Sequence, residues 1–583
     1  MCGIFGFWLN RQITENEKKR ALNSLKSFSY RGPDFSDHYI NNKRTLFLGH
    51  NRLSILDLHN RSNQPMKFDE NVIVYNGEIY NFIEIKKILA KKGITFQTNS
   101  DTEVLLRSVL CFKDKCFDYL DGMFSFALFD NQKLKIATDP FGEKPLYVFE
   151  DKDGIYFCSE ARPLINFLKL KFNPTSREIA SFLSLGFIPN GGTGYNSLRV
   201  IEPAKLIVFN SPTSSVEKKY WSINSFNTKS ELNNNFIDDF LNILIDSIRI
   251  RMRSDVPIGV FLSSGIDSSL IAAICSRELK KNISSFTISF DGKEDESPNA
   301  KRIADYLNIS NTVIPYDSKK GNRKLVDSLC DLYGVPNDNT ASYNIFEMSK
   351  LAKNYVSVIL SGIGGDEVAM GYNKYRFIQK YKFFYYLPEI VTKIGLKLFK
   401  SKNFINFFSG RDLEKIIKLK NNDSFKYLEN IINDVDVEFL ENDKHSFLEK
   451  VWLFDIMNTL PRSHLESVDR GSMRASMEIR SPFLSKKLFE KMCEIDKHTL
   501  LAKGQKFLTR TILKRFLPEN LIFDHKKGFI NPLQEWAKNI KNIPKIAGVN
   551  FDGSKSFSYS ESNLILRVCI LDKLKNYKKE NSL

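Results

Sequence analysis

The hydrophobic pattern of this chain changes near residue 232, and that change constrains the fold more than any other feature. From residue 1 to about 205, short runs of alternating apolar and polar residues lie close together, with turn residues between them. After about residue 232, apolar runs such as PIGVFLSSG and YVSVILSG alternate with helical patterns. The first pattern predicts antiparallel sheets and the second a parallel sheet. In a chain of 583 residues, we therefore expect two domains.

The expected architecture is α/β and multidomain. Residues 1–205 are expected to form stacked antiparallel sheets with helices outside them. The polar stretch 206–231 is typical of a linker. Residues 232–583 are expected to form a doubly wound parallel sheet, followed beyond about residue 375 by a mostly helical tail.

Charge and cysteine content limit the classes of function. The net charge of +17 suggests nucleic acid or an anionic surface as a partner, but the Lys residues are scattered and no nucleic-acid-binding motif is present. We therefore expect no nucleic-acid partner. No signal peptide or bilayer-spanning run is visible, and the cysteines form no CxxC pair, so we expect a soluble, cytoplasmic protein. The cysteines are Cys2, Cys111, Cys116, Cys158, Cys275, Cys330, Cys493 and Cys569.

The N-terminal sequence MCGIFGF places a cysteine directly after the initiator Met. A small second residue allows the Met to be removed, which leaves Cys2 with a free α-amine. That amine has an unperturbed pKa of about 8 and lies close enough to act as the base for its own thiol. A cysteine that only packs is the simpler alternative.

Four further stretches of the first domain carry polar residues that a fold does not require: RGPD, HNRLSI with Arg52, YNGEIYN with Asn76, Gly77 and Glu78, and NSDTEVLL with Asp101. Each has a local explanation as a cap, a turn or an ion pair. Together they suit a free amino acid. An arginine can hold its α-carboxylate, two acids its α-amine, and an amide with a glycine N–H an oxyanion. A thiolate would attack its side chain.

The stretches MCGIFGF, RGPD, NRLSILD, YNGEIYNF and TDPFGEKPLYV, in this order, resemble the glutaminase domain of class II, or N-terminal-nucleophile (Ntn), glutamine amidotransferases. The resemblance implies an αββα sandwich with Cys2 as the nucleophile. It also implies an oxyanion hole and a glutamine site. The oxyanion hole is assigned to Asn76 and Gly77, and the glutamine site to Arg52, Asn76, Gly77, Glu78 and Asp101. Thr138 stands where this family more often has Arg, and we expect only a local packing change there.

The second domain carries VFLSSGIDSSL, a strand followed by a loop of small residues and the start of a helix. Backbone N–H groups at such a helix N-terminus favour phosphate. The loop lacks the Gly-Lys-Ser/Thr ending of a Walker A motif. A plain strand–turn–helix with capping residues is the alternative. A second strand ends in the same way in VILSGIGGDEV, which contains Asp366.

The first of these loops resembles the pyrophosphate loop SGGxDSS of ATP pyrophosphatases, with Ser264 in place of the middle Gly. The resemblance implies ATP and Mg²⁺, with Asp267 and Asp366 on the metal. The stretch FDHKKGFINPL resembles an RxKxGF element, which makes Lys526 a catalytic cation, although Asp524 replaces the usual Arg. The implied nucleotide-binding residues are Phe261, Leu262, Ser263, Gly265, Asp267, Ser268, Ser269, Ile288, Ser361 and Gly362.

Taken together, the two halves resemble the glutamine-hydrolysing asparagine synthetase family over residues 1 to about 540. This implies glutamine, ATP and a carboxylate acceptor, with aspartate amidated through an acyl-AMP and with release of AMP and pyrophosphate. It implies an apolar ammonia tunnel between the domains and is compatible with a homodimer.

The sequence departs from the family pattern at two places that are expected to lie near the acceptor carboxylate. Ile363 replaces a loop acid, and NDNTASYN (337–344) replaces an arginine-bearing stretch. A sugar uronic acid or a secondary-metabolite carboxylate therefore stays open as the acceptor, as does a non-catalytic relic of the family.

Overall fold

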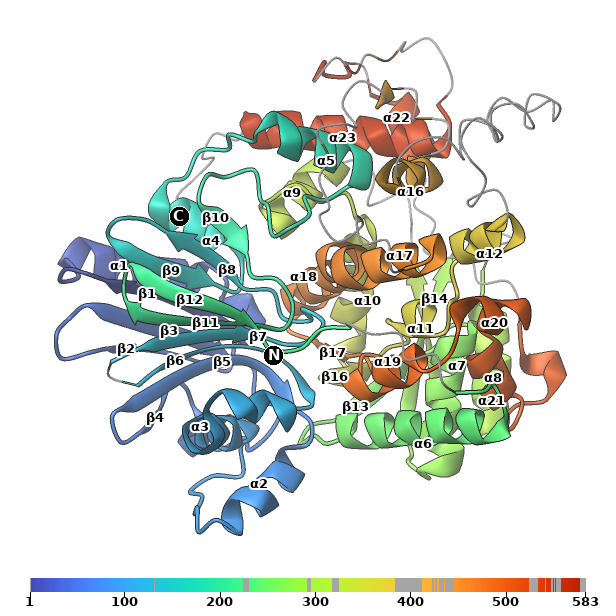
Figure 1. Cartoon of the computed structure of the whole chain (residues 1–583), viewed down its shortest axis with the longest axis horizontal. Coiled ribbons are helices and arrows are strands. Elements are labelled where there is room, and N and C mark those ends of the chain that lie inside the picture. The colour runs from blue at the N-terminus through green and yellow to red at the C-terminus, as the bar shows by residue number, and fades with distance from the viewer. Residues whose placement is uncertain are drawn as a thin grey trace.

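The computed structural model arranges the chain as two α/β domains packed side by side (Figure 1). It describes residues 2–130, 132–223, 230–290, 295–316, 324–382, 412–421, 424, 427–428, 435, 445–523, 533–540, 542–546, 549, 551 and 557–576.

The first domain is built on two six-stranded sheets, with strand orders β10-β8-β9-β1-β3-β2 and β12-β11-β7-β6-β5-β4. The strands are β1 (Gly3–Leu9), β2 (Phe35–Ile40), β3 (Leu46–Arg52), β4 (Met66–Phe68), β5 (Asn71–Ile79), β6 (Gly122–Phe129), β7 (Leu134–Thr138), β8 (Tyr147–Glu150), β9 (Gly154–Cys158), β10 (Leu198–Val200), β11 (Lys205–Ser211) and β12 (Ser214–Lys219). The helices of this half are α1 (Glu15–Ser27), α2 (Phe82–Ala90), α3 (Asp101–Phe112), α4 (Ala161–Leu168) and α5 (Ser176–Leu185).

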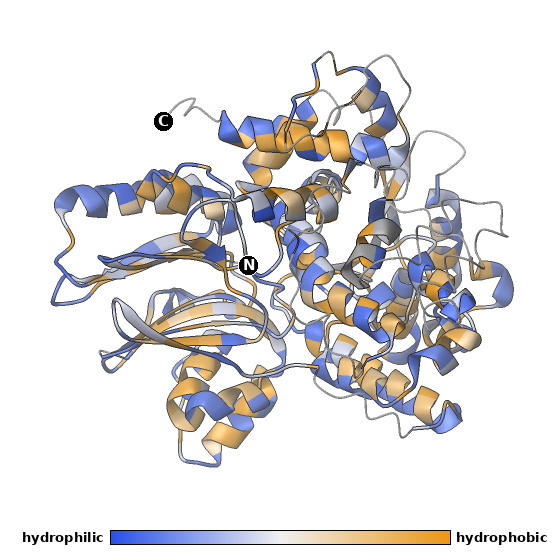
Figure 2. Ribbon diagram, turned by 45° about the horizontal axis from the view of Figure 1, so that its top comes forward, coloured by the Kyte–Doolittle hydropathy of each residue, from blue (hydrophilic) through white to orange (hydrophobic). Residues whose placement is uncertain are grey.

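The two sheets stack face to face, with helices on the outer side of each (Figure 2). Apolar side chains from both sheets, such as Ile4 and Trp8 of β1 and Val74 of β5, share one buried cluster between them. Helices α1 and α4 pack against the outer side of the first sheet, and α3 packs on the second. The αββα sandwich expected from the sequence is therefore confirmed.

The expected linker at 206–231 is wrong for its first part. Strand β11 pairs antiparallel with β7, and β12 pairs with β11, so both belong to the second sheet of the first domain. The stretch resembles a linker because five of the six residues of β12 are polar and all six, Val216 included, are exposed, which is usual for an edge strand. In β11, Leu206, Ile207 and Phe209 are buried and the other positions are more exposed.

The second domain contains a five-stranded sheet in the order β15-β14-β13-β16-β17, and every neighbouring pair is parallel. Its strands are β13 (Ile258–Phe261), β14 (Ser284–Phe290), β15 (Asn311–Tyr316), β16 (Val358–Leu360) and β17 (Glu478–Arg480). The described helices are α6 (Asn234–Arg251), α7 (Ile266–Ala273), α8 (Ser297–Leu307), α9 (Leu325–Tyr333), α10 (Ala341–Ala352), α11 (Gly365–Val368), α12 (Asn373–Lys380), α16 (Asp412–Asn421), α17 (Phe447–Phe454), α18 (Glu466–Arg474), α19 (Lys486–Cys493), α20 (Lys497–Ala502), α21 (Phe507–Leu513), α22 (Leu533–Lys538) and α23 (Tyr559–Lys575).

This strand order confirms the doubly wound sheet. The chain runs outward from β13 through β14 to β15 and then returns to the other side of β13 as β16 and β17. The order therefore reverses between β13 and β16. In open parallel sheets, ligands bind beyond the carboxyl ends of the strands at such a switch point. The loops that follow β13 and β16 contain the two small-residue motifs. None of the described helices is long and apolar enough to cross a membrane.

The two domains meet through buried ion pairs. Arg31, which follows α1, donates two hydrogen bonds to Asp469 of α18, at 2.8 and 2.9 Å, and both side chains are fully buried. Lys144 lies 3.7 Å from the same carboxylate. Glu160 of the first domain pairs with Arg31 and with Arg470 of α18, at 3.3 and 3.5 Å. Each domain thus supplies the counter-charges of the other.

This ion pair makes a stability prediction. Burial raises the pKa of Asp469, but the charge of Arg31 and its hydrogen bonds outweigh burial and hold that pKa at about 2, below the usual 3.8. We expect Asp469→Asn to cost about 3–5 kcal/mol, because it removes the charged partner to which the buried Arg31 donates two hydrogen bonds. The ionised carboxylate is favoured in the folded state. Its contribution is therefore complete above about pH 4 and declines as the pH falls toward 2.

Thermal unfolding of wild type and D469N at pH 7 and near pH 3 checks both parts. The difference in melting temperature should be large at pH 7 and smaller near pH 3. Asp153→Asn is the matched control, because Asp153 pairs with Arg11 on the exposed surface. Equal melting temperatures for wild type and D469N at pH 7 would contradict the role given to this pair.

Candidate functional site

Cys2 lies buried immediately before β1, at the edge where the two domains meet. Antiparallel pairing sets Gly3 opposite Asn51, which brings Cys2 beside Arg52 at the end of β3. The backbone N–H of Cys2 donates to Oδ1 of Asn76 at 3.1 Å. Burial raises the pKa of the Cys2 thiol, so the thiol needs a base before it can act as a nucleophile.

The second sheet presents an amide and a glycine to this cysteine. Asn76 and Gly77 lie near the end of β5, opposite Ser125 and Phe124 of β6. The Asn76 Nδ2 atom is buried and has no hydrogen-bond partner in the described part of the chain, although its own Oδ1 accepts from Cys2. A buried amide donor without a partner is unusual and is suited to a ligand oxygen. A Cβ at Gly77 would lie 2.1 Å from the Met123 carbonyl, so only glycine fits.

Arg52 is held by the loop that follows it. Its guanidinium donates to the carbonyls of Leu56, Asp57 and His59 and to Oδ1 of Asn63, at 2.6–3.2 Å. These contacts fix the Arg52 side chain against the loop 53–63. The charge of Arg52 also acts to lower the pKa of the Cys2 thiol, which places it near the nucleophile.

Glu78 and Asp101 form a buried acid pair. Asp101 is the first residue of α3, whose N-cap is Ser100, and its Oδ2 accepts from Tyr75 Oη and the Ile79 N–H at 2.8 and 2.9 Å. Burial raises the pKa of Glu78 well above its usual value, and the neighbouring Asp101 raises it further. Two such acids suit an ammonium group, whose positive charge would favour their ionised forms.

Two residues of the second domain reach this site, and the sequence did not assign them. Arg480 of β17 is fully buried, lies 3.3 Å from Glu78, and donates through Nε to Glu478 at 2.7 Å. Their stretch, EIRSPFLS, carries an acid and a base on one short strand, but nothing in its spacing shows that they face the other domain. The structure therefore adds Glu478 and Arg480 to the site around Cys2.

The loop after β13 forms a compact turn before α7. Ser263 accepts and donates within it: its N–H donates to Ser268 Oγ at 3.1 Å, and its Oγ accepts from the Gly265 N–H at 3.1 Å. Gly265 is the N-cap of α7, so the helix N-terminus faces the loop. Ser264 is not among the described residues with positive φ, which explains why a Cβ is tolerated there.

Asp267 and Asp366 come together through Lys506. The Lys506 ammonium, at the start of α21, donates to Oδ2 of Asp267 and lies 2.7 Å from Oδ1 of Asp366. Burial opposes the charge of Lys506, but the two carboxylates outweigh it and raise its pKa. The sequence singled out the two acids but not this lysine, because a KxxxR spacing on a helix has many structural explanations.

The acid pair fits a divalent cation. A Cβ at Gly365 would lie 2.6 Å from Cγ of Asp267, and one at Gly371 would lie 2.1 Å from Oδ1 of Asp366, so glycines make the room around both carboxylates. Both acids can reach a single positive charge, as Lys506 shows. No group of three or more His, Cys, Asp and Glu residues suits a metal among the described residues. Phosphate oxygens and water would therefore have to complete the shell of a Mg²⁺ ion.

These residues face a cavity of about 1420 Å³. All the predicted nucleotide residues line it except Ser269, whose hydroxyl instead donates to the Gly265 carbonyl at 2.8 Å. Lys526 and Asp524 lie outside the described residues. The lining residues from the prediction are Phe261, Leu262, Ser263, Gly265, Asp267, Ser268, Ile288, Ser361, Gly362 and Asp366.

One wall of this cavity is apolar. Ile363 packs against a cluster that includes Ile345, Val468 and Ile479, and all four residues line the cavity. The stretch 337–344 forms the turn into α10 and is fixed to the π-helix Asp455–Leu465, where Asn337 Nδ2 donates to the Arg462 carbonyl at 2.8 Å. The departures at Ile363 and in 337–344 therefore lie in one region of the second domain.

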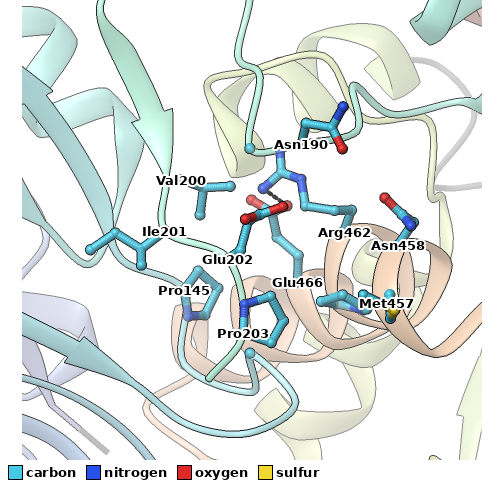
Figure 3. Close-up of a pocket in the computed structure, with 13 residues that line it drawn as sticks. Pro145, Asn190, Val200, Ile201, Glu202, Pro203, Met457, Asn458, Arg462 and Glu466 are labelled. Atoms are coloured by element: carbon cyan, nitrogen blue, oxygen red, sulfur yellow. Dashed lines mark ion pairs between the residues drawn. The ribbon is translucent and has the colours of Figure 1, made fainter. Parts of the chain in front are cut away.

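A second, smaller cavity lies between the domains (Figure 3). Its volume is about 20 Å³, enough for roughly one water molecule but not for a substrate. Arg462 and Glu466 form an ion pair at 3.3 Å beside it, and Pro203 and Asn190 come from the first domain.

The fold and the first site define the class of protein. Residues 1–221 match the model of the glutamine amidotransferase domain, which agrees with an αββα sandwich that carries Cys2 at its edge. Residues 239–572 match the asparagine synthase model. The chain belongs to the asparagine synthase family.

Full-length relatives agree with this assignment. The chain is 30% identical to glutamine-hydrolysing asparagine synthetase 1 of Bacillus subtilis, over 93% of this chain and 89% of that protein. It is 31% identical to putative glutamine-hydrolysing asparagine synthetase 2 of Methanocaldococcus jannaschii, over 81% of this chain and 98% of that protein. A solved structure of glutamine phosphoribosylpyrophosphate amidotransferase from B. subtilis matches with a TM-score of 0.30 at 16% identity, over 54% of this chain and 65% of that one.

The contacts of Lys506 predict the effect of removing it. Lys506→Met removes the cation that contacts both Asp267 and Asp366, so we expect a lower melting temperature than in wild type. Millimolar Mg²⁺ should then raise the melting temperature of K506M more than that of wild type, because the ion replaces the missing charge. Thermal unfolding with and without MgCl₂ measures both effects.

Lys503→Met is the matched control, because Lys503 lines the same cavity but is exposed. A K506M variant that melts like wild type and does not respond to Mg²⁺ would contradict the acid pair as a cation site.

Proposed function

We propose that this chain hydrolyses glutamine at Cys2 and uses the ammonia for an ATP-driven amidation in the second domain. Removal of the initiator Met gives Cys2 a free α-amine that takes the proton of its thiol. The thiolate attacks the side-chain carbonyl carbon of glutamine, the C–N bond breaks, and the protonated nitrogen leaves as ammonia. Water then hydrolyses the Cys2 thioester and releases glutamate.

The residues around Cys2 support this sequence of steps. Asn76 Nδ2 and the N–H of Gly77 stabilise the oxyanion that forms on the attacked carbonyl. Arg52 holds the α-carboxylate of glutamine, and Glu78 with Asp101 holds its α-amine. The observation that carries the proposal is the buried amide of Asn76, which accepts from the Cys2 N–H and keeps its own donor available.

In the second domain, a carboxylate oxygen of the acceptor attacks the α-phosphorus of ATP, and pyrophosphate leaves. Ammonia then attacks the acyl carbon of the acyl-AMP, the bond to AMP breaks, and an amide forms. The N–H groups of the loop 263–268 and the N-terminus of α7 bind phosphate oxygens. Lys506 supplies a positive charge to the same region. The resemblance of FDHKKGFINPL to the RxKxGF element assigns a further cation, Lys526, to the reaction.

Mg²⁺ held by Asp267 and Asp366 would neutralise charge on the phosphates. Without the metal ion, the carboxylates of Asp267 and Asp366 would repel the phosphates of the nucleotide. Among the described residues, Lys506 offsets part of that repulsion in the protein itself.

Aspartate is the acceptor that we propose first, because both similar full-length relatives are named as asparagine synthetases. A second candidate is a different carboxylic acid, such as a sugar uronic acid or a secondary-metabolite acid. The apolar packing of Ile363 favours this second candidate, because the family has an acid at that position in the loop.

Cys2→Ala tests the first half of the proposal. We expect loss of glutaminase activity and of glutamine-dependent AMP release, while AMP release with added ammonium stays within about twofold of wild type. Cys111→Ala is the control for loss of a thiol, because Cys111 is exposed and outside both sites. Mass spectrometry of the purified protein should show Cys2 as the first residue. Glutamine hydrolysis by C2A would refute the assignment of the nucleophile.

The acceptor is decided by pyrophosphate and AMP release with glutamine and ATP in the presence of aspartate or of a uronic acid such as glucuronate. Aspartate-dependent release supports asparagine formation. Release that needs the uronic acid and is independent of aspartate would replace it with the second candidate. Nucleotide-dependent stabilisation without turnover on any acid would identify a non-catalytic relic.

A further inference from the structure

A short segment of the second domain, residues 251–257, lies against the glutamine site of the first. It connects the end of α6 to the start of β13. β13 then runs directly into the loop 263–268 of the nucleotide cavity. The segment is therefore a continuous piece of chain between the two sites.

Asp255 makes two reciprocal contacts with the loop 53–63. Its backbone N–H donates to the Ile55 carbonyl at 3.0 Å, and its Oδ2 accepts from the backbone N–H of Asp57 at 2.8 Å. The Asp255 side chain is exposed, but the peptide group that it holds belongs to a buried residue.

Asp57 connects Asp255 to Arg52 through its two peptide groups. While its N–H donates to Asp255, its carbonyl accepts from Arg52 Nη2 at 2.6 Å. Its carboxylate accepts from Arg61 and from the N–H of Asn99, two residues before Asp101. Asp57 adopts a positive φ of 45°, a conformation that costs energy for a non-glycine residue and needs such contacts to persist.

The same segment also contacts the other side of the proposed glutamine site, at Tyr80 and Glu84. Arg253 donates to the Tyr80 carbonyl, just after β5, at 2.7 Å and forms a two-bond ion pair with Glu84 of α2 at 2.6 Å. The carbonyls of Arg251 and Arg253 accept from Arg480 at 2.7 and 2.6 Å. Residues 251–255 therefore contact both sides of the proposed glutamine site: the loop 53–63 on one side, and Tyr80 and Arg480 on the other.

We propose that Asp255 is a positioning residue for glutamine: from the second domain, it holds the Asp57 peptide, and through it the guanidinium of Arg52, in the orientation that binds the α-carboxylate. This inference rests on the proposed function, because it takes Arg52 as the group that binds glutamine. Asp255 touches no substrate and takes no part in the chemistry at Cys2.

The geometry separates this role from general stabilisation. Loss of the Asp255 carboxylate frees the Asp57 peptide N–H in the loop 53–63, but leaves Asn76, Gly77 and the contact of the Cys2 N–H with Asn76 in place. The affinity for glutamine should fall, while the rate of the bound complex should not. A residue that only stabilised the fold would affect every activity alike.

The test measures glutaminase kinetics of Asp255→Ala without ATP. We expect the KM for glutamine to rise about 3- to 10-fold, the effect of one hydrogen bond to a charged, exposed partner, with kcat within twofold. Asp255→Asn keeps an oxygen acceptor and should restore the KM to within about twofold of wild type. Asp246→Ala is the control, because Asp246 is an exposed acid of α6 that pairs with Arg249 on the same helix.

A glutamine analogue with an uncharged α-amide in place of its α-carboxylate isolates the part of Arg52. Wild type should use this analogue less well than glutamine, and D255A should use it as well as wild type does. A D255A penalty of the same size for both substrates would place the effect outside Arg52 and overturn the proposal.

Ammonium-dependent AMP release reports whether the second domain remains folded, and it should be unchanged in D255A. Should D255A fail to fold, Asp255→Lys removes the acceptor while keeping a long polar side chain at this exposed position, and the same rise in KM is expected. Wild-type protein without glutaminase activity would instead refute the proposed function itself. Unchanged KM in D255A, with an active wild type, overturns only the role of Asp255.

Discussion

The buried charge network between the domains is the interaction on which the rest of the structure depends. Arg31 and Asp469 have no contact with solvent in the docked domains, and Asp469 finds its partners Arg31 and Lys144 only in the other domain. Such charges are very costly unless they are paired. The network therefore fixes how the two domains dock. Because Glu78 pairs with Arg480 across the same interface, docking also completes the site around Cys2.

Fixed docking matters for a protein of this family because ammonia becomes ammonium in neutral water and loses its nucleophilicity. Beside the site of Cys2, apolar side chains from both domains form one buried cluster. Leu53, Ile55, Tyr80 and Met123 come from the first domain, and Ile250, Val358 and Met473 come from the second. The cluster includes Val358 of β16, the strand whose carboxyl end opens into the nucleotide cavity. An uncharged molecule could pass this contact region at lower cost than an ion. In the same interface, the charged network fixes the docking of the domains, and the apolar cluster provides a surface that favours neutral ammonia over ammonium.

The sequence predicted the stacked antiparallel sheets of the first domain and the doubly wound parallel sheet of the second, because alternating and continuous apolar runs are local properties of the chain. It also singled out Cys2, Asn76 and Asp366, which lie in short motifs at strand ends. It did not identify Arg480, Lys506 or Asp255, because their partners Glu78, Asp366 and Asp57 lie 140 or more residues away in the chain and only the fold brings them together. The exposed edge strand β12 was missed for a different reason: it buries nothing, so it has no apolar period to read.

The cavity that we propose for the nucleotide has two parts with different constraints. Around Asp267 and Asp366, a Cβ at Gly365 or Gly371 would clash with the carboxylates, and Lys506 offsets part of their charge, so substitutions there would disturb the proposed phosphate site. The wall formed by Ile345, Ile363 and Val468 makes ordinary apolar contacts, which tolerate exchange for residues of similar volume. A change of acceptor would therefore be expected first in that wall. This difference explains why Asp267 and Asp366 are retained while position 363 has changed: electrostatics constrains the proposed phosphate side of the cavity, and shape constrains the proposed acceptor side.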